Sequence, residues 1–257
     1  MIRTGIIGGP LADRLLQRLG ERAERKGYCD GSSYLGRSKL EMLFGEGIWS
    51  ELSGRTVADF GCGSGGEAVE MAEHGAASVI GIDILDHSLE TARRAAEKAG
   101  VSGRCRFGKH ADTPVDLVVS LDGFEHFGDP GAVLETMARM LRPTGRVLAT
   151  FGPTWLHPLG GHLFSVFPWA HLLFTERALI RWRSRFKHDG ATRFGEVEGG
   201  LNQMTIARFR RLVARSPLEF ETLETIPIRR LRAISNPVTR EFVTSFVRCR
   251  LRPRAGR

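Results

Sequence analysis

The sequence has few cysteines for its length, four in 257 residues, and no two of them form a CxxC pair. They are Cys29, Cys62, Cys105 and Cys249. Because they stand so far apart, we expect neither a disulfide framework nor a structural zinc site. A secretory signal peptide is not visible either, since the apolar stretch after Arg3 ends at Pro10. These absences favour a reducing compartment, and we expect the protein in the cytoplasm.

A hydrophobic run that could cross a membrane is also lacking. Residues 147–175 contain no Asp, Glu, Lys or Arg, and these 29 residues would be long enough by count. Pro153, Pro158 and Pro168 interrupt the stretch, however, and each break frees backbone groups that lipid cannot satisfy. We therefore expect a buried strand followed by an apolar loop or lid, with no membrane span.

The chain shows no internal repeat or low-complexity tract, but its charge is unevenly placed. Residues 1–150 carry 18 Lys and Arg against 21 Asp and Glu, whereas residues 151–257 carry 19 against 8. A basic half of this kind can face nucleic acid or another polyanion, and it can equally consist of arginines on solvated helix faces. We expect the solvated faces, so nucleic acid is not the partner that we favour.

From residue 56 the pattern alternates between short β-branched runs and amphipathic segments. Strands are predicted at residues 56–60, 78–83, 104–108, 115–120 and 146–151, with helices at 67–74, 88–99 and 131–141 between them. Such alternation favours a doubly wound, mostly parallel sheet with helices on both faces. Before it, residues 10–26 and 37–44 predict helices, and after it residues 152–204 are irregular. A helix at 205–216 and strands near 220–227 and within 242–251 complete the chain.

The most informative motif is the glycine cluster that ends the first strand, Gly61-Cys62-Gly63-Ser64-Gly65-Gly66. Glycines there let the backbone turn tightly and approach a ligand, and the turn points helix N–H groups at whatever binds. The spacing also satisfies the dinucleotide pattern GxGxxG. Asp83, at the end of the second strand, suits ribose hydroxyls in either case. Asp59, just before the first glycine, favours a ligand with a cationic amino group over a pyrophosphate.

On these residues the chain resembles the class I S-adenosylmethionine (SAM) methyltransferases. Residues 57–65 are similar to the first motif of that family, residues 120–130 to the segment after its fourth strand, and residues 141–146 to its LxPGG turn, with Thr144 in place of the first glycine. The resemblance implies a seven-stranded α/β sheet with SAM bound at its carboxyl edge. It implies these cofactor-binding residues: Asp59, Gly61, Cys62, Gly63, Asp83, Ile84, Asp112 and Leu121. We expect a helical cap over residues 1–54, a SAM-binding domain over 55–257 and a substrate-side insertion over 152–204.

Beyond the fourth strand, Asp122-x-x-Glu125-His126 places two carboxylates and an imidazole close together. The segment resembles that of two metal-dependent O-methyltransferase groups, one acting in ubiquinone synthesis and the other on small-RNA 3′ ends. The resemblance implies that Asp122, Glu125, His126 and His162 hold a magnesium or manganese ion, which would lower the pKa of a bound hydroxyl. His126, His157 or His162 acting as a general base without metal is the second interpretation. Histidines that only line the pocket are the third.

The insertion supplies candidate acceptor contacts. Its aromatic run can cover a ring-containing acceptor and exclude water, or it can pack the insertion onto the sheet. The residues singled out for acceptor binding are Tyr34, Trp155, Trp169, His171 and Asn202. We therefore expect SAM-dependent methylation of a small molecule, most readily on oxygen. Methylation of RNA or another polyanion is the first alternative, and an NAD-dependent oxidoreductase using the same glycine turn is the second. Neither the acceptor nor the oligomeric state is encoded in a motif.

Overall fold

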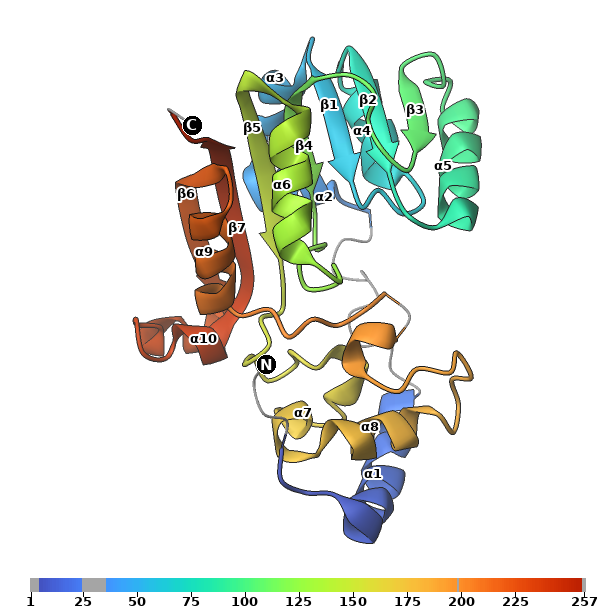
Figure 1. Ribbon diagram of the computed structural model, residues 1–257, viewed down its shortest axis with the longest axis vertical. Coiled ribbons are helices and arrows are strands. Elements are labelled where there is room, and N and C mark those ends of the chain that lie inside the picture. The colour runs from blue at the N-terminus through green and yellow to red at the C-terminus, as the bar shows by residue number, and fades with distance from the viewer. Residues whose placement is uncertain (1–4, 25–35, 198, 256–257) are drawn as a thin grey trace.

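The computed structural model describes residues 5–24, 36–197 and 199–255, and its centre is a seven-stranded sheet (Figure 1). The strand order is β3-β2-β1-β4-β5-β7-β6. The first five strands run parallel, while β7 pairs antiparallel with both β5 and β6, which confirms the expected mostly parallel sheet. The strands are β1 (Thr56–Phe60), β2 (Ser78–Ile82), β3 (Cys105–Gly108), β4 (Val115–Ser120), β5 (Leu141–Phe151), β6 (Leu218–Pro227) and β7 (Thr244–Pro253).

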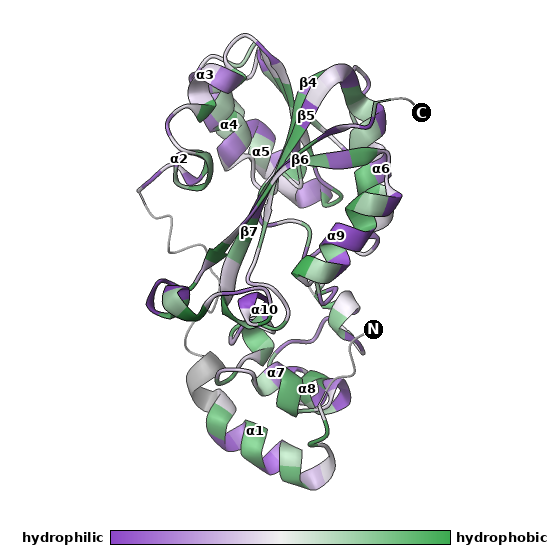
Figure 2. Cartoon of the chain, turned by 90° about the vertical axis from the view of Figure 1, so that its left-hand side faces the viewer, coloured by the Kyte–Doolittle hydropathy of each residue, from purple (hydrophilic) through white to green (hydrophobic). Residues whose placement is uncertain are grey.

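Helices cover both faces of the sheet because its central strands are apolar on both sides. Val57 and Ala58, neighbours in β1, are both fully buried and belong to different core clusters. One face packs against α2 (Lys39–Phe44), α3 (Ile48–Leu52), α4 (Gly66–Glu73) and α5 (Asp86–Lys98). The other packs against α6 (Pro130–Met140) and α9 (Ile206–Arg215). Figure 2 shows the sheet with α2, α3 and α4 on one side and α6 and α9 on the other.

A third core lies beyond the carboxyl ends of the parallel strands, where Figure 1 shows α1 beside the insertion. Here α1 (Gly9–Glu24) packs against α7 (Ala170–Leu173) and α8 (Glu176–Arg183). The contact is close, since a Cβ atom at Gly20 would lie 2.3 Å from Nε1 of Trp182. The segment expected as one N-terminal cap thus divides, with α1 joining the insertion and α2 and α3 packing on the sheet.

The remaining elements are short. Among the described residues, 3-10 turns occupy His162–Phe164, Phe194–Glu196 and Arg229–Ile234, and α10 spans Arg240–Val243. The strand β5 begins five residues before its predicted start, because the helix ends at Met140 and the chain continues directly in extended backbone, with Leu141 paired to Val115. Within the described residues, no helix is both long enough and apolar enough to span a membrane.

Candidate active site at the carboxyl edge of the sheet

The glycine turn between β1 and α4 is held against the end of β2. Gly61, Gly63 and Gly65 all adopt positive φ angles, of 83°, 51° and 81°, a region that residues with a Cβ atom avoid. The backbone N–H groups of Gly61 and Cys62 both donate to the carbonyl oxygen of Ile82, at 2.8 and 3.0 Å. At Gly65 a Cβ atom would lie 2.6 Å from that of Ala92. The turn therefore depends on glycine both for its dihedral angles and for its approach to α5.

Asp59 lies at the base of this turn and is almost fully buried, with 3% of its surface exposed. Its Oδ2 atom has no hydrogen-bond partner among the described residues. Burial raises the pKa of Asp59 to about 8; the negative charge of Glu67 adds to the rise and Lys39 opposes it. A buried carboxyl with an unused oxygen is a site where a cationic group would be stabilised.

Asp83 follows β2 and shares the same edge. Its Oδ2 atom accepts the N–H of Gly63 and its Oδ1 atom accepts the N–H of Leu85, both at 2.9 Å. The carboxylate therefore connects the glycine turn to the start of α5 and is fixed in place. Cys62 is buried beside it, and burial raises the pKa of the Cys62 thiol, so it remains a thiol at neutral pH.

Beyond β4, three side chains converge. One ligand atom each from Glu125, His126 and His162 lie within 4.8 Å of one another, although 36 residues separate the two histidines in sequence. Oε1 of Glu125 accepts the N–H of Gly152 at 2.9 Å, while its Oε2 atom and Nε2 of His162 are buried without a partner among the described residues. Nδ1 of His126 lies 2.9 Å from the carbonyl oxygen of Gly200. In the neutral imidazole that nitrogen is therefore the protonated one, and Nε2 carries the free lone pair.

The charge state of this cluster follows from its burial. Burial raises the pKa of Glu125 to about 8, and the neighbouring charge of Asp122 adds to the effect. Burial also lowers the pKa of His162 to about 3, with a contribution from His126, and that of His157 to about 4. At neutral pH both of these imidazoles are neutral and weakly basic.

Asp122 is not part of this group. One of its carboxylate oxygens lies 3.0 Å from Nζ of Lys39, and the other accepts the hydroxyl of Thr150 at 3.2 Å. Its backbone has a positive φ of 50°, a conformation that residues other than glycine seldom adopt. Of the four ligands predicted from sequence, the structure thus brings three together, and Asp122 instead pairs with the lysine that precedes the first strand.

Two cavities meet at His126. One, of about 630 Å³, is lined by His126, Phe127, Asn202 and residues of α9 and the 3-10 turn Phe194–Glu196. The other, of about 210 Å³, is lined by His126, His162 and residues of the insertion. The ring of Phe127 joins the larger cavity to the glycine turn, since a Cβ atom at Gly61 would lie 3.8 Å from its Cε1 atom.

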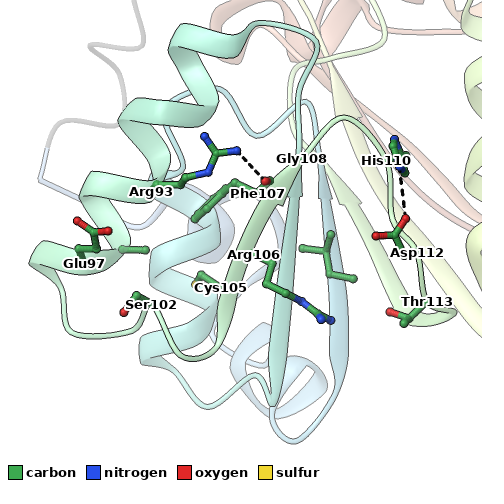
Figure 3. A pocket seen from close by; sticks show the side chains of 12 residues that line it. Arg93, Glu97, Ser102, Cys105, Arg106, Phe107, Gly108, His110, Asp112 and Thr113 are labelled. Carbon is green, nitrogen blue, oxygen red and sulfur yellow. Dashed lines mark hydrogen bonds and ion pairs between the residues drawn. The ribbon is translucent and has the colours of Figure 1, made fainter.

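A further cavity of about 510 Å³ opens at the edge strand β3 (Figure 3). It is lined by Arg93, Arg106 and Asp112, among others, and by none of the residues of the glycine turn. In Figure 3, Arg93 points at the carbonyl oxygen of Phe107, 3.1 Å away, and Asp112 pairs with His110. Asp112 is largely exposed in the six-residue link between β3 and β4, and Ile84 is 82% exposed. Both remain predicted cofactor contacts.

Comparison with known proteins places residues 58–149 in a family described as a methyltransferase domain. A ubiquinone biosynthesis O-methyltransferase of Neisseria meningitidis is 38% identical over 105 residues, which cover 38% of this chain and 44% of that protein. A tRNA 5-carboxymethoxyuridine methyltransferase of Escherichia coli is 38% identical over 97 residues, covering 35% and 37%. The chain thus matches less than half the length of these curated relatives.

Solved structures extend the likeness to the whole fold. A SAM-dependent methyltransferase from Mesorhizobium loti covers 79% of this chain and 92% of its own, with a TM-score of 0.52 and 19% identity. The chain thus matches a methyltransferase domain at residues 58–149, within a fold of the class I SAM-dependent methyltransferase type. A 4+2 cyclase, SpnF, superposes over 99% of this chain and all of its own, with a TM-score of 0.57 and 14% identity. At such identities the likeness concerns the fold alone.

The predicted acceptor residues have different environments. Tyr34 lies outside the described residues. Trp155 and His171 belong to the core of the insertion, with 1% and 0% exposure, and both nitrogens of His171 are bonded, to the hydroxyl of Ser165 and the carbonyl oxygen of Trp155. Trp169 is 38% exposed and donates to the carbonyl oxygen of Leu156. The aromatic run therefore serves mainly to pack the insertion.

Asn202 has a positioning role that its sequence context did not reveal. Its side-chain amide donates to the carbonyl oxygens of Phe124 and Phe127, at 2.6 and 2.8 Å. Its backbone N–H donates to the carbonyl oxygen of Glu125. It thereby fixes the segment that carries the convergent side chains. Sequence reasoning also missed Phe127, because an aromatic residue beside Glu125 and His126 carries no signal until the fold brings it against Gly61.

Proposed function

We propose that this methyltransferase transfers a methyl group from SAM to an oxygen atom of a small-molecule acceptor bound beside His126. The observation that carries the proposal is the pairing of two features at one sheet edge. The glycine turn offers the carboxyl oxygen of Asp59 that has no partner among the described residues, and the Glu125, His126 and His162 group lies beyond the neighbouring strand. Bound SAM would supply a methyl group already activated by its sulfonium charge.

The cofactor-side residues fit SAM better than a dinucleotide. A pyrophosphate would meet the buried carboxyl of Asp59, whereas the amino group of a methionine moiety would complement it. The sheet order points the same way, because the dinucleotide fold has the order 3-2-1-4-5-6, while here β7 is inserted antiparallel between β5 and β6. The oxidoreductase alternative therefore has no support from this fold.

The role of the chain's own residues is to align the acceptor and to take its proton. Alignment of reacting groups can supply about 7–11 kcal/mol of a barrier. Of the three predicted bases, His157 and His162 have strongly lowered pKa values, and a base is inefficient when its pKa lies far below that of the group it deprotonates. Nε2 of His126, oriented by the bond from Nδ1 to the carbonyl oxygen of Gly200, is the base that the geometry favours.

A divalent cation fits the same group. Oε2 of Glu125 and Nε2 of His162 are buried without partners in the described part of the chain, and the bond from Nδ1 of His126 to a backbone carbonyl is the support that metal-binding histidines usually have. Two imidazoles with one carboxylate suit manganese or another transition metal better than magnesium. When bound there, the ion would lower the pKa of an acceptor hydroxyl.

An acceptor of the polyanion class has weaker support, because many cations of the basic half are used internally. Arg248 pairs with Glu224, Arg250 with Glu51 and Arg252 with Glu219. Arg254 donates to carbonyl oxygens at the end of α9. Nucleic-acid binding that weakens steeply between low and moderate salt would reverse this preference.

The test compares His126→Asn with His110→Asn, which changes an exposed histidine in the link before β4. We expect both variants to bind SAM as the unchanged protein does in calorimetry, and only His126→Asn to lose turnover, by about 100-fold or more. If a chelator abolishes turnover of the unchanged protein and manganese restores it, we assign His126 the role of a metal ligand. If turnover survives the chelator, we assign His126 the role of the general base. Full activity of His126→Asn, or binding of NAD in place of SAM, contradicts the proposal.

A further inference from the structure

The larger of the two cavities at His126 is lined by three arginines. Arg208 and Arg211 lie one turn apart on α9, and Arg193 precedes the 3-10 turn Phe194–Glu196 of the insertion. The cavity, of about 630 Å³, has the size of a small-molecule site. Its walls therefore combine one element of the sheet domain with one of the insertion, and both bring cationic side chains to it.

None of these three guanidinium groups lies within ion-pair distance of a carboxylate in the part of the chain that the structure describes. Arg208 is half-buried and donates to the carbonyl oxygen of Asn202, which fixes its direction. Burial, and then the positive charge of Arg211, lowers the pKa of Arg208, while Asp129 opposes this. The three arginines therefore make no ion pair within the described residues, and Arg193 and Arg211 are exposed to solvent.

Two acids also line the cavity, and both are already engaged by backbone N–H groups. Oε1 of Glu176 accepts the N–H of Phe194 at 2.6 Å. Oε2 of Glu196 accepts the N–H and the hydroxyl of Thr192, and these bonds, with a smaller effect of Arg193, lower the pKa of Glu196. These contacts hold the turn that carries Arg193, and the three arginines outnumber the two acids around the cavity.

The cavity is continuous with the proposed reaction site. His126 lines it, and so does Phe127, whose ring lies against Gly61 and, edge to face, against Phe60 at 5.7 Å between centroids. Asn202 lines it as well, and it also fixes the segment carrying Glu125. A ligand seated among the arginines would therefore extend to the histidine that the proposed function uses.

We propose that the cavity formed by Arg193, Arg208 and Arg211 binds an anionic group, a carboxylate or a phosphate, of the methyl acceptor. This deepens the proposed function and rests on it, because it names the class of acceptor brought to His126. Guanidinium groups match the geometry of both anions with paired hydrogen bonds. The anionic group anchors the acceptor at α9, and the hydroxyl to be methylated lies at the other end of the molecule.

The test uses the double variant Arg193→Gln/Arg211→Gln, which leaves Arg208 in place because Arg208 also holds Asn202. The matched control is Arg210→Gln/Arg215→Gln, which removes two exposed arginines of α9 that do not line the cavity. Calorimetry compares 3,4-dihydroxybenzoate with its primary amide, and phenyl phosphate with phenol. These pairs separate a carboxylate site from a phosphate site.

We expect the unchanged protein to bind at least one anion about tenfold or more tightly than its neutral partner, as charge-assisted bonds imply. The cavity variant loses that preference and the control keeps it. Equal binding of anion and neutral partner, no binding of any of the four probes, or an equal loss in the control overturns the inference. Binding of a single-stranded RNA that depends on Arg193 and Arg211 while the small anions do not bind also overturns it.

Failure of this inference and failure of the proposed function give different results. SAM binding is measured on the same three proteins, and we expect it to be equal in all of them. If SAM does not bind the unchanged protein, the proposed function fails whatever the anions do. If SAM binds and the anions show no preference, only the anionic acceptor is excluded.

Discussion

Replacing Asp59 with asparagine should change how the stability of the protein depends on pH. In the folded state burial raises the pKa of Asp59 to about 8, whereas an unfolded aspartate has a pKa of about 3.9. Between these values the folded state binds more protons than the unfolded state, so the free energy of unfolding falls as pH rises. The Asp59→Asn variant has no titrating group at this position, so this part of the fall in the free energy of unfolding disappears.

The size of the effect follows from the two pKa values. From pH 5 to pH 8 the carboxyl of Asp59 removes up to roughly 3–4 kcal/mol from the free energy of unfolding. Urea unfolding at pH 5, 6.5 and 8, followed by tryptophan fluorescence, measures that loss. We expect Asp59→Asn to be close to the unchanged protein at pH 5 and clearly more stable relative to it at pH 8. Saturating SAM should reduce the difference at pH 8, because a bound amino cation favours the ionised carboxylate.

Asp116→Asn provides a contrast of opposite sign. Asp116 accepts the N–H of Thr56 and pairs with Arg142, and these bonds outweigh burial and lower its pKa. The ionised carboxylate of Asp116 stabilises the folded state above the pKa of an unfolded aspartate, and this stabilisation is lost only in acid. Asp116→Asn should therefore be less stable than the unchanged protein, and the difference should be constant from pH 5 to pH 8. If Asp59→Asn and the unchanged protein lose stability in parallel over that range, Asp59 does not titrate as a buried acid.

Two further substitutions test the cofactor edge. Asp83→Ala should weaken SAM binding by about 1–3 kcal/mol through the loss of charged hydrogen bonds. Asp86→Ala changes a nearby exposed carboxylate and should leave SAM binding unchanged, and calorimetry measures both affinities. Unchanged affinity in Asp83→Ala would place the ribose elsewhere. Gly65→Ala should destabilise the fold by about 2–4 kcal/mol, because its φ is positive and its Cβ atom would meet Ala92. Gly66→Ala meets nothing within 4 Å, and equal melting temperatures for both variants would contradict the tight turn.

The sheet could be predicted from sequence because each strand is a short apolar run ended by glycine or a polar residue. β1 and β4 begin and end at their predicted residues. In β2, β3 and β5 the observed first and last residues differ from the predicted ones by at most one position, except that β5 begins five residues early. The packing of α1 could not be predicted in this way. Its apolar stripe, which includes Leu16, fits any apolar surface, and only the folded insertion with Trp182 shows which one it covers.

The candidate site divides in the same way. Asp59 and Asp83 could be placed because they adjoin strand ends, and parallel strands bring their carboxyl ends to one edge. Asp122 could not, because its positive φ and its pairing with Lys39 depend on how α2 packs. The arginines of α9 and the insertion resemble solvated surface residues in sequence, and only the folded chain gathers them around one cavity.

The segment that matches the methyltransferase family ends at residue 149, and this limits what the names of relatives imply for the acceptor. It contains the glycine turn, Asp83 and the segment from Asp122 to Phe127. It contains neither His162 nor the three arginines, which lie in the insertion and on α9. One curated relative is named for ubiquinone biosynthesis and another for a tRNA nucleoside, so their names do not agree on an acceptor. We therefore expect residues 152–211 to determine the acceptor of this chain, and exchanging that segment should change the acceptor while leaving SAM binding intact.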